Sequence, residues 1–151
     1  MTRFLLCIHV LAAIVAIGPV TVAASMFPAV ARRAFAGPGA SGDQVSVLGT
    51  LHRICRVYAV VGIAVPVFGF ATAGSLGVMG DAWLIASIGL TVVAAGVLAL
   101  LVLPGQARIL ATAAEPAGST RRLAMYTGMF NLLWALVTVL MIVRPGSTTG
   151  A

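Results

Sequence analysis

The stretch that decides the fold runs from Leu51 to Ala73 and reads LHRICRVYAVVGIAVPVFGFATA. It opens with His52, Arg53 and Arg56, and no charged residue follows from Val57 to Ala73. At about 1.5 Å per residue, a helix of this length crosses a hydrocarbon layer of about 30 Å. The stretch therefore predicts a transmembrane helix with basic residues at one end.

The composition extends this interpretation to the whole chain. Of its 151 residues 61% are hydrophobic and only 8% are charged, whereas soluble domains carry about a quarter charged residues. All nine basic residues are arginine, and the formal charge is +6. Because the arginines lie in short gaps between apolar runs, we expect anionic lipid headgroups, and not nucleic acid, as their partners. The two cysteines, Cys7 and Cys55, match neither a metal-ligand spacing nor a disulfide framework.

Three further apolar runs complete a predicted all-α fold, a single integral membrane domain with four transmembrane helices. The expected spans cover about residues 4–26, 52–73, 83–103 and 123–143. We expect cytoplasmic loops at 27–51 and 104–122 and a disordered tail at 145–151. A cleaved signal peptide is the alternative for the first run, but that run is longer than a typical signal-peptide core and further apolar segments follow it.

Turn and capping residues predict where these helices begin and end. Pro19 should kink the first span, and Pro104 with Gly105 should stop the third. The spacing Ser41-x-x-Gln44 fits a capping box, so a helix should restart near Asp43 and continue into the second span. Asp81 should likewise cap the third span.

The distribution of arginine predicts the orientation. Only Arg3 and Arg144 lie on one side, and seven arginines flank the two longer loops on the other. Because arginine-rich short loops stay in the cytoplasm, we predict two out-in-out hairpins with both termini outside, in a bacterial cytoplasmic (inner) membrane. The seven are Arg32, Arg33, Arg53, Arg56, Arg108, Arg121 and Arg122.

Small and polar residues inside the spans indicate how the helices pack. Gly62 and Gly69 are seven residues apart on the second span, as are Gly89 and Gly96 on the third. Small residues on one face let two helices approach closely in lipid, so we expect the second and third spans to pack along these glycines. Asn131 and Thr138 are candidates for polar contacts between helices.

His9 is the most suggestive functional candidate because an ionisable side chain inside a span is costly. Three interpretations stay open: a neutral imidazole bonded to Thr72, Ser87 or Thr138, a ligand of haem b or a metal, and a proton or quinone site. His9 and His52 should lie about 24 Å apart along the membrane normal, which argues against one haem held by both.

At the basic end of the second span, His52 and Arg56 are four residues apart and share a helix face. Arg56 either snorkels to headgroups or joins His52 in a pocket for an anion or lipid phosphate, completed by Arg121 or Arg122. We expect lipid or anion contacts at Arg53, Arg56, Arg121 and Arg122.

Catalytic signatures are missing from the sequence. It has no phosphate-binding glycine loop, no H-E-x-x-H or C-x-x-C motif and no paired carboxylates within a span. The leading hypothesis is a non-catalytic accessory or interaction subunit that binds other membrane proteins or itself. A haem- or quinone-linked redox protein using His9 is the alternative, and a small-molecule carrier is the third.

Two segments carry a resemblance to known proteins: FLLCIHVLAAIVAIGP at 4–19 and LHRICRVYAVVGIAVPVFGF at 51–70. On them the chain resembles a family of small bacterial four-helix integral membrane proteins of unknown function, which implies a fold and a location. A more distant similarity is to the membrane protoporphyrinogen oxidase of haem synthesis and to copper-resistance membrane domains. His9 and Gly18 match their pattern, but no Trp stands between them.

Overall fold

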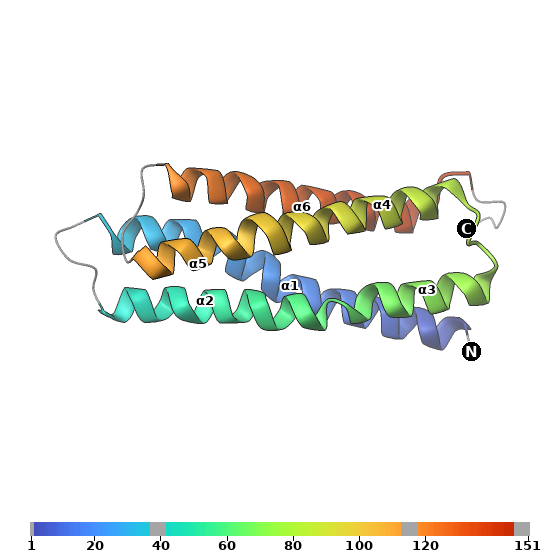
Figure 1. Ribbon diagram of the computed structural model, residues 1–151. Helices are drawn as coiled ribbons and strands as arrows, with labels where there is room; N and C mark the ends of the chain where they lie inside the picture. The colour runs from blue at the N-terminus through green and yellow to red at the C-terminus, as the bar shows by residue number, and fades with distance from the viewer. Residues whose placement is uncertain (1, 37–41, 113–117, 147–151) are drawn as a thin grey trace.

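A computed structural model describes residues 2–36, 42–112 and 118–146, and these residues form helices and connecting turns without a strand. Four helical stretches are long and apolar enough to cross a membrane, which confirms the predicted all-α architecture. Figure 1 shows them side by side, with the start of α1 and the end of α6 at the same end. In chain order the elements are α1 (Thr2–Ala34), α2 (Gly42–Val61), α3 (Ala64–Leu76), α4 (Ala82–Val97), the π-helix η1 (Leu98–Val102), α5 (Leu103–Thr112) and α6 (Ser119–Val143).

The first helix is longer than predicted. α1 includes both Pro19 and Pro28 and ends at Ala34, so residues 27–34 of the segment expected as a cytoplasmic loop are helical. Phe27 and Ala31 are completely buried in the main core, and their packing continues the helix past Pro28. A proline inside a membrane bundle removes one backbone hydrogen bond without ending the helix, because neighbouring groups satisfy the freed carbonyl.

The second span is divided into α2 and α3. α2 begins at Gly42, which confirms the predicted start near Asp43, whereas Ser41 lies outside the described residues. The division falls at Gly62 and Ile63, just before Pro66. Pro66 has no N–H for the carbonyl of Gly62, and the N–H of Val65 donates to that carbonyl at 3.1 Å. The backbone therefore tightens for one turn before α3 continues.

The third span continues where the sequence predicted a stop. Pro104 and Gly105 lie inside α5, which follows α4 and η1 without a loop (Figure 1), so the expected helix stop at Pro104 is wrong. Residues 104–112 of the segment expected as a cytoplasmic loop are helical. The N–H of Leu103 donates to the carbonyl of Leu98 in the wider π-helical pattern of η1. That widening makes room for the proline ring, and the helix extends to Thr112.

Asp81 occupies the predicted capping position of α4, but its side chain bonds elsewhere. No side-chain hydrogen bond caps the helix, and Asp81 Oδ2 accepts a hydrogen bond from Trp83 Nε1 at 2.9 Å. The guanidinium of Arg144, just after α6, lies 5.5 Å from the centre of the Trp83 ring. These two contacts join the start of α4 to the end of α6.

The helices pack in a different order from the one predicted. α1 contacts α2, α3 and α6, while α4 packs mainly on α6 and α5 meets α2. The expected packing of the second span on the third along four glycines is therefore wrong. Gly69 faces His9 of α1, and neither Gly89 nor Gly96 has an atom within 4 Å of the place where a Cβ would stand. Spacing alone shows that a helix has a small-residue face, but not which neighbour covers it.

The larger of the two core clusters lies toward the end where α2 begins and α5 ends. Its buried members come from α1, α2, α4, η1, α5 and α6, and Figure 1 shows α2 and α5 beside each other at that end. A small second cluster, which includes Ala73, Trp83 and Leu84, lies toward the opposite end. The basic end of the bundle is thus its best-packed part.

Candidate functional site

A buried amide organises the polar groups of the basic end. Gln106 of α5 is completely buried. Its Oε1 lies 3.0 Å from Nδ1 of His52, and its Nε2 donates to Sγ of Cys55 at 3.6 Å. Both partners are on α2, so this side chain links α5 to α2 in the middle of the main core. Both polar atoms of the Gln106 side chain, Oε1 and Nε2, therefore have a hydrogen-bond partner, as is usual for buried polar groups.

This network fixes the tautomer of His52. An amide oxygen only accepts hydrogen bonds, so Nδ1 of His52 carries the proton in the contact with Gln106. Nε2 is then the ring nitrogen that can accept a hydrogen bond. The ring borders a shallow groove of about 530 Å³ that is also lined by Arg53, Arg56 and Val57. His52 therefore presents a defined nitrogen to a basic, partly open surface.

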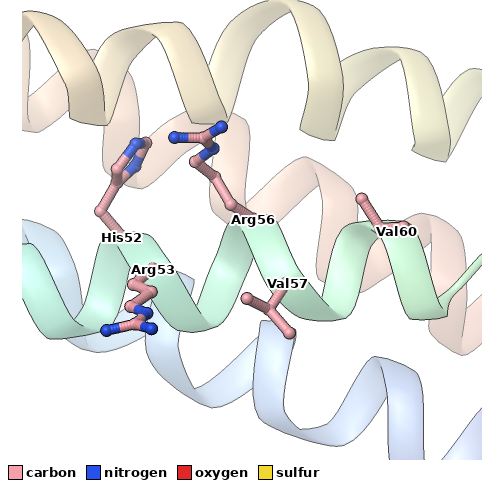
Figure 2. A pocket seen from close by; sticks show the side chains of 5 residues that line it. All are labelled: His52, Arg53, Arg56, Val57 and Val60. Carbon is pink, nitrogen blue, oxygen red and sulfur yellow. The ribbon is translucent and has the colours of Figure 1, made fainter.

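The side chains in this groove do not all point the same way. Figure 2 shows His52 and Arg56 on one side of α2, directed toward the yellow helix of the third span, and Arg53 on the opposite side. The shared face expected for the first two is confirmed. Arg121 lines neither this groove nor the one that contains Arg122, which lies between α5 and α6. The anticipated pocket combining His52 and Arg56 with those two arginines is therefore not formed.

His9 occupies a separate site near the other end of the bundle. Its Nδ1 lies 2.9 Å from the carbonyl oxygen of Val65 in α3, and the ring packs on Gly69, one helical turn further along. A Cβ at Gly69 would stand 3.0 Å from Cε1 of the ring. Because a carbonyl only accepts, His9 donates from Nδ1, and Nε2 is the nitrogen left for another partner. Val65 and His52 are 13 residues apart along one span, so the histidines lie roughly 20 Å apart along it.

The hydroxyl groups expected to bond His9 bond their own helices instead. Thr72 donates to the carbonyl of Phe68, and Ser87 donates to the carbonyl of Trp83. Thr138, which was also a candidate for a contact between helices, donates to the carbonyl of Trp134 within α6. A hydroxyl in a helix reaches the carbonyl four residues earlier without any cost of association, and that local bond prevails here.

A row of polar atoms lies on one face of α6. Asn131 donates from Nδ2 to Oγ of Ser25 on α1 at 3.0 Å, so this side chain does bridge two helices. Three nearby atoms on the same face are buried without a hydrogen-bond partner among the described residues. They are Oγ1 of Thr127, Oδ1 of Asn131 and Nε1 of Trp134. α6 therefore carries the least satisfied polar surface of the bundle.

Two groups that bind the histidines, the amide of Gln106 and the carbonyl of Val65, were not predicted from the sequence. The amide of Gln106 had a possible signal, since it follows a Pro-Gly pair within an otherwise apolar segment. The carbonyl of Val65 had none, because every residue carries one. No group of three or more His, Cys, Asp or Glu side chains suited to a metal occurs among residues 2–36, 42–112 and 118–146.

Comparison with protein-family models, with curated proteins and with solved structures finds no match to this chain. The resemblance to small four-helix membrane proteins stays a prediction, and function has to be argued from the residues themselves.

Proposed function

We propose that this chain is a small multi-pass protein of the bacterial cytoplasmic membrane that acts as a non-catalytic accessory subunit of a larger membrane assembly. The seven arginines near the segments that join α1 to α2 and α5 to α6 support an orientation with that end in the cytoplasm and both termini outside. In that orientation Trp83 and Arg144 lie near the outer surface.

The uncovered face of α4 is the observation that carries this proposal. The residues of this face recur at alternating intervals of four and three, which places them on one side of the helix, and all but one of them are alanine or glycine. Gly89 is exposed with open space beside it, and the half-buried Gly96 is equally unobstructed. The members of this α4 face are Ala82, Ala86, Gly89, Val93 and Gly96.

The partner expected on this face is a transmembrane helix of another membrane protein. In lipid the hydrophobic effect does not drive helices together, and close packing of two backbones stabilises their association instead. Small side chains permit that close packing. α4 packs on α6, and buried residues such as Leu84 and Ser87 lie on another side of α4 than this face. The α4 face is thus the side on which a further helix approaches without displacing the bundle.

A pair of matched substitutions tests the proposal. A photo-crosslinking residue at position 89 should capture one membrane protein in intact cells, and Gly96→Leu should abolish that capture. Gly18 provides the control, because it is an exposed glycine on α1, also without a neighbour within 4 Å. Crosslinking from position 18 and the Gly18→Leu variant should give neither effect. Capture of a second copy of this chain alone, or a purified monomer that turns over a substrate, would contradict the proposal.

A haem- or quinone-linked redox role for His9 is the second candidate. Histidines that bind metals usually donate their other ring N–H to a carbonyl or carboxylate, as His9 does to Val65. If this role holds, the protein purified from haem-replete cells should show a visible absorption band that His9→Ala removes. A spectrum that does not change with the substitution would exclude the haem form, and proteoliposome flux would reveal a carrier.

A further inference from the structure

A second groove, of about 330 Å³, lies between α5 and α6. It differs from the groove beside His52 because two helices form it and because it has a polar and an apolar end. Arg108, Ser119 and Arg122 line one part, while Leu100 and Leu101 of η1 line another. The distribution of these side chains indicates what kind of molecule fits.

The polar end is suited to an anion. Arg108 comes from α5 and Arg122 from α6, so each of the two helices contributes one positive charge to the lining of the groove. Oγ of Ser119 is buried and has no hydrogen-bond partner among the described residues. Ser119 is also the first residue of α6, where free backbone N–H groups favour negative charge. No carboxylate is among the described residues that line this groove.

The apolar end of the groove lies toward the membrane-spanning part of the helix, where the acyl chain of a bound lipid would lie. Leu100 and Arg108 are eight residues apart on nearly continuous helix, which corresponds to about 12 Å along the axis. Leu100 lies on the side of the arginines that leads into the long apolar run of α4, and it is one of the most exposed leucines. A molecule bound here would place its charged part near the basic end of the bundle and its hydrocarbon along the membrane-facing helix.

We propose that this groove binds one anionic phospholipid, with its phosphate between Arg108 and Arg122 and an acyl chain along Leu100 and Leu101. Ser119 Oγ donates to a phosphate oxygen. The π-helix supports the site because the Pro104–Gly105 segment that it accommodates forms part of the groove wall. Wide helical turns of this kind are frequent at functional sites.

Adjacent arginines give a matched pair of test variants. Arg121 and Arg122 are both exposed at the start of α6, but only Arg122 lines the groove. The test is a titration of the full chain in mild detergent with phosphatidylglycerol, in which native mass spectrometry measures the bound lipid. Arg122→Gln should weaken binding about tenfold or more, the effect of losing a charge-assisted contact. Arg121→Gln should weaken it at most about fivefold, the general effect of one charge near a membrane.

Further variants keep the test decisive. Arg108→Gln removes the other arginine of the groove, on α5, and should also weaken lipid binding. The test therefore does not depend on Arg122→Gln alone being tolerated. Ser119→Ala should weaken lipid binding without lowering the melting temperature in lipid-free detergent, because the hydroxyl it removes makes no bond within the protein. A purely structural serine would show the reverse.

Two outcomes would overturn the inference. Equal losses for Arg121→Gln and Arg122→Gln would mean that the arginines only contribute diffuse charge. Inorganic phosphate that binds wild type and competes with phosphatidylglycerol at similar concentrations would make a free anion the ligand. Phosphatidylcholine, which has the same phosphate but no net charge, should bind more weakly than phosphatidylglycerol in wild type, and the difference should become smaller in Arg122→Gln.

Discussion

Replacing Gly69 by alanine should destabilise the bundle through His9. The new methyl group would stand 3.0 Å from Cε1 and 3.3 Å from Nδ1 of the imidazole, closer than side-chain carbons ordinarily approach. Because Gly69 is part of α3, the ring is the group that moves. Moving it disrupts the hydrogen bond from Nδ1 to the carbonyl of Val65, which is 2.9 Å long in the wild-type protein.

The size of the effect follows from three contributions. Overpacking a tight site costs about 1–3 kcal/mol, and losing one neutral hydrogen bond costs about 0.5–1.5 kcal/mol. In the opposite direction, replacing glycine by alanine within a helix stabilises it by about 0.5–1 kcal/mol. The free energy of unfolding of Gly69→Ala should therefore fall by about 0.5–4 kcal/mol.

Equilibrium unfolding in mixed detergent and SDS micelles measures this difference, and two other variants control it. Gly89→Ala introduces the same methyl group where no atom lies within 4 Å, so its stability should equal or slightly exceed that of wild type. In a His9→Ala background the ring is absent, and Gly69→Ala should cost nothing. If Gly69→Ala proves as stable as Gly89→Ala, or if its cost persists without the imidazole, the reasoning is refuted.

Three other substitutions test separate contacts. Gln106→Leu leaves Nδ1 of His52 unpaired and should lower the free energy of unfolding by about 1–3 kcal/mol, with most of that loss absent in a His52→Phe background. Additive losses in the two backgrounds would contradict the coupling. Arg144→Gln removes the guanidinium from the Trp83 ring and should cost about 0.5–1 kcal/mol, detected as a lower melting temperature with altered tryptophan emission. Unchanged emission would count against that contact. Pro66→Ala restores a backbone N–H at the break between α2 and α3, and hydrogen exchange at residue 66 should be slow if the helix becomes continuous and fast if it does not.

The number and approximate position of the helices could be predicted because membrane spans depend on local composition. A run without charge, such as Val57 to Ala73, is sufficient evidence for one helix. The ends were harder to predict. The first span was expected to end near Met26 and the third at Pro104, but Phe27 packs in the core and continues α1, and a π-helix accommodates Pro104. Whether proline ends a helix depends on its surroundings in three dimensions.

The contacts of the site residues could be predicted only in part. The common face of His52 and Arg56 follows from helical spacing and needs no knowledge of other helices. The partners of His9 and His52 are a backbone carbonyl and a distant amide, 56 and 54 residues away in the sequence. Such pairings arise only when the helices are packed, and the order of packing could not be read from the glycine pattern.

The length of α1 has a consequence for the forces that hold the bundle. Its 33 residues extend about 50 Å, roughly 20 Å more than a bilayer's hydrocarbon is thick. With the apolar part of the second span in hydrocarbon, the surplus and much of the larger core project on the arginine-rich side. There water contributes a hydrophobic drive that lipid cannot supply. Cooling and urea weaken that drive, so they should loosen the basic end first and leave the opposite end folded.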